Sequence, residues 1–332
     1  MEIKEVVDQQ QFWPLPPDPR PQTSDRRMER QFIAWLRERL PPHPLLRLGP
    51  GDDAAVLRMT GVEQCVVTVD MLNDHVDFEL AQIDPRLAGR KALAANLSDL
   101  AAMAAEPLAG VVALALPRQR GMELAVAIYE GLLPLAEKYG VAIVGGDTNS
   151  WDGPLAISIT LLGKATGRGP LKRSGALPGD RIIVTGSFGG SILGRHLQFE
   201  PRVREALALH ARYELHAGID VSDGLSCDLA HIVEESRCGA VLDIDRIPVA
   251  ADARRLAEKL ADGSTALDHA LGDGEDFELI LAAPPAEARR MLAEQPLCVP
   301  LTDIGEYTAE PGLWQSNAAG ERRPLAPRGW EH

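Results

Sequence analysis

The sequence predicts a two-domain protein of the α/β (or α+β) class, and three observations support this fold class. The chain has 332 residues, about twice the length of a typical domain. β-Rich runs alternate along it with segments whose apolar residues recur at helical spacing, a pattern typical of sheets flanked by helices rather than of a bundle or a sandwich. A stretch rich in glycine and proline, residues 166–171, separates two such series and predicts the domain boundary.

Three segments follow from this division. Residues 1–27 contain a proline-rich run that cannot form a regular element, because proline fixes φ and removes a donor, and we expect a flexible extension there. Residues 28–165 form the expected N-terminal domain. It begins with a helix over 27–40, in which Phe32, Leu36 and Leu40 make an apolar stripe. Residues 166–332 form the expected C-terminal domain.

Hydrophobic periodicity predicts the elements of both domains. In the N-terminal domain we expect strands over 65–70, 111–116, 141–144 and 155–163 and helices over 85–105 and 122–139. In the C-terminal domain we expect strands over 180–185, 218–221, 240–244 and 277–282, helices over 225–236 and 251–261, and a further helix after a glycine turn at 186–190.

Composition excludes several classes of function. The formal net charge of −14 disfavours binding to nucleic acid, whose phosphates the protein would repel. No run approaches the roughly 20 apolar residues of a membrane span, and the N-terminus lacks the order of a secretory signal. The four cysteines are far apart and predict buried free thiols in a reducing compartment. We therefore expect a cytoplasmic protein with neither nucleic acid nor membrane as partner.

Short acidic motifs beside glycines or at the ends of apolar runs are the main functional signal. Asp70 ends an apolar strand, where open sheets gather their ligands. Alternation along this strand places Thr68 and Asp70 on one face and Val67 and Val69 on the other. Asp99 lies in an alanine- and leucine-rich helix, where a carboxylate is costly unless it is paired or bound to a metal. The motifs occupy six positions: Gly51-Asp-Asp53, Val69-Asp70, Asn96-Leu-Ser-Asp99, Gly145-Gly-Asp-Thr148, Asp220-Val-Ser-Asp-Gly224 and Gly272-Asp-Gly-Glu-Asp276.

Each motif also has a structural interpretation. Gly51–Asp53 is also compatible with a solvated turn. Gly145–Thr148 fits either an anion-binding loop after a buried strand or a tight turn capped by Asp147. A helix N-cap at Ser222 or Asp223 would explain one residue of its motif but not the other two. The glycine turn 186–190 resembles a phosphate-binding turn, but it lacks the Lys-Ser/Thr end of a Walker loop, so we favour a structural turn.

The residue types together favour phosphoryl transfer. Many carboxylates without an obvious base or nucleophile suit a reaction that depends on positioning and charge neutralisation. Ligands that are all oxygen favour Mg²⁺ over zinc or copper. The eight histidines show no metal-ligand spacing. The motifs therefore predict a cage of several Mg²⁺ ions around a polyphosphate.

The order of the motifs resembles the thiamine-monophosphate kinase family over nearly the whole chain, from about Phe32 to Trp330. Two runs specific to this family and its close relatives are Asn-Leu-Ser-Asp-Leu-Ala-Ala-Met (96–103) and Asp-Val-Ser-Asp-Gly-Leu (220–225). Five further motifs carry the resemblance: Gly-Asp-Asp-Ala-Ala-Val-Leu (51–57), Val-Asp-Met-Leu (69–72), Val-Gly-Gly-Asp-Thr (144–148), Arg-Ser-Gly-Ala-Leu-Pro-Gly-Asp (173–180) and Gly-Glu-Asp-Phe-Glu-Leu (274–279).

The resemblance implies a fold, a reaction and an assembly. The fold is that of the aminoimidazole ribonucleotide synthetase-like superfamily, with mixed sheets flanked by helices. The reaction is ATP-dependent phosphorylation of thiamine monophosphate to thiamine diphosphate with Mg²⁺. The assembly is a homodimer formed through the N-terminal domains.

The resemblance also implies roles for individual residues. The catalytic residues would be Asp99, Asp147 and Asp220, and ATP would be bound by Tyr129, Gly146, Asp147, Arg173 and Ser222. The substrate would be bound by Asp77, Glu275 and Trp330. The Mg²⁺ ligands would be Asp53, Thr68, Val69, Asp70, Asp99, Asp147, Asp220 and Asp223.

Two positions depart from the family pattern. Val69 stands where a hydroxyl residue is usual, so only its backbone carbonyl could serve as a ligand. Asp77 stands where histidine is usual, and an aspartate there could pair with a cationic thiamine ring or alter the substrate. Two other functions stay open at this point: another ATP-dependent synthetase of the superfamily, and a non-catalytic protein that binds divalent ions through the acidic run at 268–276.

Overall fold

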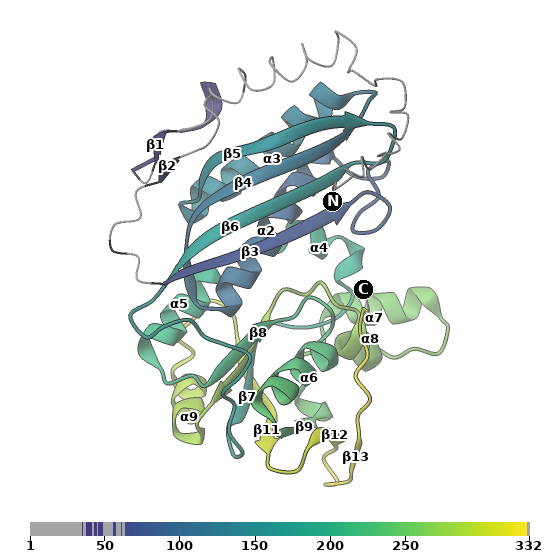
Figure 1. Cartoon of the computed structure of the whole chain (residues 1–332). Coiled ribbons are helices and arrows are strands. Elements are labelled where there is room, and N and C mark those ends of the chain that lie inside the picture. Colours follow the sequence, from purple (N-terminus) through teal and green to yellow (C-terminus); the bar gives the residue numbers. More distant parts are fainter. Residues whose placement is uncertain are drawn as a thin grey trace, which may run out of the picture.

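Two large sheets and the helices around them form most of the described part of the chain (Figure 1). The computed structural model describes Trp35, Gly61 and residues 38–41, 43–44, 46–48, 56–57 and 64–330. The predicted extension 1–27, most of the predicted helix 27–40 and Asp53 lie outside these residues. Strands β1 (Leu46–Leu48) and β2 (Val56–Leu57) form a separate two-stranded sheet.

A mixed four-stranded sheet forms the N-terminal half. Its order is β3–β6–β4–β5, with β4 and β5 parallel and the other neighbours antiparallel. Helices α2 and α3 cover one face of this sheet, as Figure 1 shows. The bounds are Cys65–Asn73 for β3, Pro85–Ala102 for α2, Ala105–Pro117 for β4, Gly121–Tyr139 for α3, Ala142–Trp151 for β5 and Ala156–Ala165 for β6.

Strand β3 shows the predicted alternation, but Asp70 does not end it, because pairing with β6 extends the strand to Asn73. Thr68 and Asp70 face the helices and are half-buried, whereas Val67, Val69 and Met71 are exposed on the opposite side. We call that opposite side of the four-stranded sheet the outer face. The three outward side chains of β3 keep 60%, 61% and 63% of their surface exposed, so the outer face has an apolar edge without a covering helix among the described residues.

The prediction for Gly145–Thr148 is wrong. These residues form neither a loop nor a turn; they continue β5, which pairs in parallel with β4 as far as Trp151. The pairing with β4, which sequence periodicity does not reveal, carries the strand through its two glycines. Asp147 lies opposite Ala113 in this register, so its exposed side chain is on the outer face rather than at a loop tip.

A seven-stranded sheet forms the C-terminal half. Its order is β13–β12–β9–β11–β7–β10–β8, and all neighbours are antiparallel except β12 and β9. The strands are β7 (Arg181–Thr185), β8 (Ala217–Asp220), β9 (Gly239–Asp243), β10 (Leu279–Ala283), β11 (Leu301–Thr308), β12 (Gly312–Ser316) and β13 (Arg322–Pro324).

Helices cover both faces of this sheet. α6 (Leu225–Ser236) and α8 (Ala266–Gly272) share one core with it, and α5 (Val203–Arg212) and α9 (Pro285–Glu294) share another. The predicted helix after the glycine turn is only two short pieces, η1 (Ser191–Leu193) and α4 (Arg195–Gln198). The remaining elements are η2 (Ile244–Arg246) and α7 (Ala251–Leu260).

Helix α2 links the two halves. It begins at Pro85 after the N-cap Asp84, whose side chain accepts the Arg86 N–H at 3.0 Å. Its alanines let neighbours approach on nearly every side, and α2 contacts α3, β3, α4, α5 and β8. One hydrophobic core therefore runs from the four-stranded sheet through α2 to β7, β10 and α9.

Two further predictions can be compared with the structure. Cys238 is buried as expected, but Cys65 and Cys298 are exposed, so the prediction of uniformly buried thiols is wrong. Cys65 is the first residue of β3 and Cys298 lies in the loop between α9 and β11, so neither needs to enter a core. Within the described residues, no helix has both the length and the apolar character needed to cross a membrane.

Reciprocal glycine contacts between α2 and α3 predict a stability effect. A Cβ at Gly131 would lie 1.8 Å from the Arg86 carbonyl oxygen, and one at Gly89 would lie 2.1 Å from that of Ile128. Gly131→Ala should therefore lower the free energy of unfolding by about 1–3 kcal/mol through overpacking. Helix propensity alone would raise it by about 1 kcal/mol.

Urea denaturation followed by circular dichroism measures this effect. Glu137→Ala, at an exposed position of the same helix, is the matched control and should stay within about 0.5 kcal/mol of the parent. A Gly131→Ala variant that is as stable as the parent would show that the helices can separate freely.

Candidate active site

Three buried or half-buried aspartates from separate elements form the centre of the site. Asp70 comes from β3, Asp99 from α2 and Asp220 from the end of β8. Two of these aspartates each accept a hydrogen bond from a hydroxyl group. Thr68 Oγ1 donates a short hydrogen bond to Asp99 Oδ2, and Ser98 Oγ donates to Asp220 Oδ2 at 2.6 Å. The structure thus brings together residues 68, 70, 99 and 220, which the sequence predicted to act together.

Burial and mutual repulsion raise the pKa values of these carboxyl groups. Burial is the largest cause for Asp70, and the charges of Asp99, Asp220 and Asp77 add to it, so its pKa rises to about 7. Burial and Asp99 raise the pKa of Asp220 to about 7 as well. Burial also raises the pKa of Asp99, opposed by the Thr68 hydrogen bond and by Arg173. The positive charge near these carboxylates is therefore too small to neutralise them.

A divalent cation fits this carboxylate cluster. Asp70 Oδ2 is buried and has no hydrogen-bond partner among the described residues. An unpaired buried carboxylate oxygen is costly, whereas oxygen ligands are what Mg²⁺ prefers. Arg173, on the loop between β6 and β7, contributes positive potential to Asp99 and Asp220 from an exposed position.

A cavity of about 710 Å³ adjoins the cluster between the two halves. Its polar lining includes Asp70, Ser222 and Asp223. All three residues predicted to bind the substrate also line it: Asp77, Glu275 and Trp330. Val76, Ile192, Leu193, Leu256 and Leu260 supply an apolar wall.

The loop 221–224 after β8 positions two of these lining residues through its backbone. The Ser222 carbonyl accepts the Glu275 N–H at 2.7 Å, and the Asp223 carbonyl accepts the Trp330 N–H at 2.9 Å. Glu275 has a φ of 52°, a left-handed conformation that non-glycine residues seldom adopt. The hydrogen bond to Ser222 stabilises this strained conformation, and the conformation in turn holds the Glu275 side chain at the cavity wall.

Lys91 is a lining residue that the sequence reasoning missed. Its side chain is 1% exposed, forms a short ion pair with Glu275 and donates to the Asp77 carbonyl at 2.6 Å. A lysine is almost never this buried unless it is paired. Its spacing could have revealed it, because Lys91, Ala95 and Asp99 recur every four residues and so share one face of α2.

The two departures from the family pattern take different positions. Asp77 lines the cavity, and its Oδ2 accepts the Asn73 N–H at 2.6 Å. The Val69 side chain points to the outer face, away from Asp70. An apolar side chain on that face provides no ligand to the cluster.

The glycine turn 186–190 is structural, as favoured from the sequence. Asp276 accepts the Gly189 N–H at 2.9 and 3.0 Å, and Asp273 accepts the Gly190 N–H at 2.8 Å. The donors that could have bound a phosphate are therefore used by the protein's own carboxylates. Asp276 also pairs with Arg195 at 2.8 Å, and burial raises its pKa to about 7.

Other predicted site residues lie apart from the cluster. The Tyr129 side chain is 2% exposed and packs in the core shared with α2, where burial raises its pKa. Gly146 and Asp147 lie on β5, with Asp147 on the outer face. Within one chain, the side chains of Asp147 and Asp70 therefore lie on opposite faces of the sheet. Asp53 is outside the described residues.

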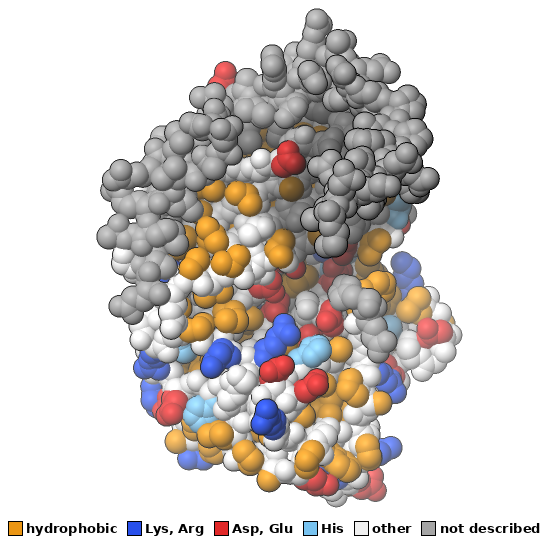
Figure 2. All heavy atoms as spheres, in the orientation of Figure 1, with side chains coloured by type: hydrophobic (Ala, Val, Ile, Leu, Met, Phe, Trp, Pro, Cys, Tyr) orange, Lys and Arg blue, Asp and Glu red, His pale blue; other side chains and the backbone are white. Residues whose placement is uncertain are grey.

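The space-filling view agrees with this geometry. Figure 2 shows acidic side chains gathered at the junction of the two halves, below the four-stranded sheet. Above them, hydrophobic side chains spread over the part of the outer face that is visible there. In this view the acidic side chains therefore adjoin the apolar part of the outer face.

Comparisons with known proteins match both halves. The family model of the AIR synthase related protein, N-terminal domain, covers residues 51–165, and that of its C-terminal domain covers residues 177–313. Thiamine-monophosphate kinase of Rhodopirellula baltica is 44% identical over 312 residues, which is 92% of this chain and 97% of that protein.

Two solved structures are similar over most of the chain. Thiamine-monophosphate kinase from Stenotrophomonas maltophilia has a TM-score of 0.72 and 36% identity, covering 88% of this chain and 95% of its own. AaThiL complexed with AMPPCP and TMP has a TM-score of 0.70 and 25% identity, covering 81% and 87% of the two chains.

The raised pKa values predict how stability depends on pH without metal. Between the ordinary aspartate pKa of 3.8 and about 7, folded Asp70 and Asp220 hold protons that the unfolded chain releases. The free energy of unfolding should therefore fall as pH rises through this window. In chelator at pH 8, Asp70→Asn should be more stable than the parent by roughly 1–3 kcal/mol, with little difference at pH 4.5.

Thermal unfolding at both pH values, in chelator, measures this difference. Asp152→Asn, which removes a carboxylate with an 83% exposed side chain, is the control and should change little at either pH. The charge-repulsion explanation fails if Asp70→Asn is less stable than the parent at pH 8.

Proposed function

This chain belongs to the thiamine-monophosphate kinase family, and we propose that it transfers the γ-phosphoryl group of ATP to thiamine monophosphate, giving thiamine diphosphate and ADP. One observation carries the proposal: a buried carboxylate cluster opens into a cavity that holds the matching substrate residues. AaThiL binds AMPPCP, an analogue of ATP, together with TMP.

Several Mg²⁺ ions would be held by residues of the cluster and of the adjoining loop. Asp70, Asp99, Asp220 and Thr68 are the ligands that lie together, and Asp223 borders the cavity beside them. When bound, the ions would neutralise the carboxylates and the phosphates between them. The unpaired Asp70 Oδ2 and the raised pKa values support this role.

The protein's residues need to position the phosphates rather than move a proton. The attacking phosphate has its second pKa near 6, so it is already largely anionic at neutral pH. Its oxygen bonds to the γ-phosphorus as the bond to the β–γ bridging oxygen breaks, and ADP leaves. Arg173 adds a permanent positive charge on the side of Asp99 and Asp220. This scheme agrees with the lack of a base or nucleophile among the predicted site residues.

The cavity suits the thiamine part of the substrate. Trp330 offers a flat aromatic face, half of it exposed, and the apolar wall would cover the rest of the ring system. The Asp77 side chain borders the cavity and offers a negative charge to a cationic ring, which supports substrate binding at this departure from the family pattern. Lys91 fixes Glu275 beside it.

The alternative of a divalent-ion-binding protein through residues 268–276 has little support. Asp268 caps α8 in a capping box with Thr265, and Asp273 and Asp276 bind backbone N–H groups. The carboxylates of that run therefore already have structural partners. A second ATP-dependent synthetase activity of the superfamily has no specific observation in its favour.

We also propose a homodimer that forms through the outer face of the N-terminal domain. Val67, Val69 and Met71 expose an apolar edge there, and Val111 is 40% exposed on the same face. Asp147 lies on this face too. Gly146 and Asp147 would thus act on a nucleotide at the interface with a second copy. We further propose that residues 28–165 and 166–332 are the two domains, and that the protein is cytoplasmic.

Neutral replacement of the cluster should abolish turnover. Asp99→Asn and Asp220→Asn should each lower kcat at least about 100-fold, because phosphoryl transfer depends on charge positioned in this site. The assay uses Mg-ATP with thiamine monophosphate and detects thiamine diphosphate by chromatography, with free thiamine as a parallel acceptor.

Asp152→Asn is again the matched control, because it removes an exposed carboxylate that is distant in sequence from the residues of the cluster. It should retain the parent kcat. Full activity of both cluster variants would refute the function proposed for these carboxylates, and a preference for free thiamine would show that Asp77 marks a different acceptor.

The dimer proposal predicts a change of molecular mass. Val67→Glu combined with Met71→Glu should convert the dimer to a monomer in light scattering, because charge replaces the apolar edge of the interface. Leu177→Glu, at an apolar position 52% exposed in the C-terminal half, is the control and should leave the dimer intact. A parent protein that is already monomeric would contradict the proposal.

A further inference from the structure

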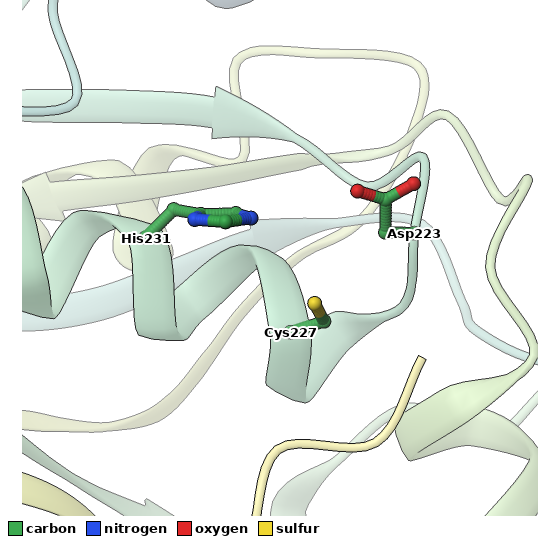
Figure 3. Close-up of side chains that lie close together, drawn as sticks. All are labelled: Asp223, Cys227 and His231. Atoms are coloured by element: carbon green, nitrogen blue, oxygen red, sulfur yellow. The ribbon is translucent and has the colours of Figure 1, made fainter. Parts of the chain in front are cut away.

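A second set of metal-binding side chains lies beside the carboxylate cluster. Asp223, Cys227 and His231 bring a carboxylate, a thiol and an imidazole together, with one ligand atom from each within 4.8 Å of the others (Figure 3). The sequence reasoning found no histidine at metal-ligand spacing. Comparison of the histidines with one another does not reveal this group, because the residue one helical turn from His231 is a cysteine.

The start of α6 explains this arrangement. Cys227 and His231 are four residues apart, so their side chains project from one face of the helix. Asp223 is four residues before Cys227, in the turn that enters the helix through Gly224 with a φ of 135°. Figure 3 shows the His231 ring extended along the helix toward Asp223, with the Cys227 sulfur between them.

Backbone hydrogen bonds fix the turn that carries Asp223. The buried Asp228 carboxylate accepts the Asp223 N–H at 3.1 Å and the Gly224 N–H at 3.0 Å. The Asp223 carbonyl accepts the Trp330 N–H. All three ligand residues are half-buried, so a cation would be partly shielded yet still reachable from solvent. The ligands are therefore positioned before any ion arrives.

We propose that Asp223, Cys227 and His231 form a site for Zn²⁺ that competes with the Mg²⁺ cluster. Thiolate and imidazole ligands prefer zinc, whereas Mg²⁺ prefers oxygen. Ligand atoms around tetrahedral zinc are roughly 3.3–3.8 Å apart, so small side-chain rotations close the set. Three protein ligands leave a fourth position for water or a phosphate oxygen. Binding releases the Cys227 thiol proton to solvent.

Asp223 connects this zinc site to the reaction. Its side chain lines the substrate cavity, and it is one of the residues proposed to hold Mg²⁺. A carboxylate turned toward zinc is withdrawn from the magnesium side, so zinc should inhibit phosphoryl transfer even when Mg²⁺ is in excess. This inhibition rests on the proposed kinase function, whereas zinc binding itself does not.

Cobalt binding tests the site independently of activity. Co²⁺ added to the full-length protein should give a thiolate-to-cobalt charge-transfer band that Zn²⁺ displaces. Cys227→Ser should remove the band, and His231→Gln should weaken binding at least about tenfold. The controls are Cys65→Ser, at an exposed thiol, and His75→Gln, in the Asp74–His75–Glu79 group that lacks a thiol. Both should behave as the parent.

The result that overturns the site is wild-type Co²⁺ affinity in Cys227→Ser and His231→Gln, or no band in the parent. If Cys227→Ser does not fold, the Co²⁺ affinity of His231→Gln alone decides whether the site exists. In the kinase assay with saturating Mg²⁺, Zn²⁺ should inhibit the parent and spare Cys227→Ser. Equal inhibition of both would refute the competition. A parent that shows the band but no kinase activity would refute the proposed function and leave the zinc site standing.

Discussion

Mutual repulsion among buried carboxylates is the constraint on which the site depends. Asp70, Asp99 and Asp220 come from three elements, and Arg173, a nearby cation, is exposed and screened by solvent. Such a cluster is unfavourable unless protons or metal ions neutralise it. The fold tolerates this cost because α2 is fixed on several sides by a shared core, and α2 therefore holds Asp99 beside Thr68 of β3 and the end of β8.

The substrate cavity follows from the same arrangement. The loop that contains Asp223 determines through its backbone where Glu275 and Trp330 lie, and α2 determines where Lys91 meets Glu275. The residues that neutralise phosphate charge and the residues that contact the acceptor are thus positioned by the same two segments. A shift of either segment would misplace both partners of the reaction, and the strained backbone of Glu275 is part of this arrangement.

Much of this could be predicted from the sequence. The alternation of β3 placed Thr68 and Asp70 on one face, and the bounds predicted for α6 match the structure. The remaining features depend on contacts between distant residues. The extension of β5 through Gly145–Thr148 depends on pairing with β4, the partners of Gly189 and Gly190 come from residues 273 and 276, and the burial of Tyr129 depends on how α3 packs. Helices α5, α8 and α9 were missed because their apolar stripes are short.

Proton release on metal binding tests the central idea, that the carboxylate cluster is built to be neutralised by divalent cations. Calorimetric titration of Mg²⁺ into metal-free protein, in two buffers of different ionisation enthalpy, measures the protons released. The carboxyl pKa values of about 7 predict release at pH 6.5 that disappears toward pH 8.5 and that is reduced in Asp70→Asn. Magnesium binding without proton release at pH 6.5, or with the same release in Asp70→Asn, would contradict it.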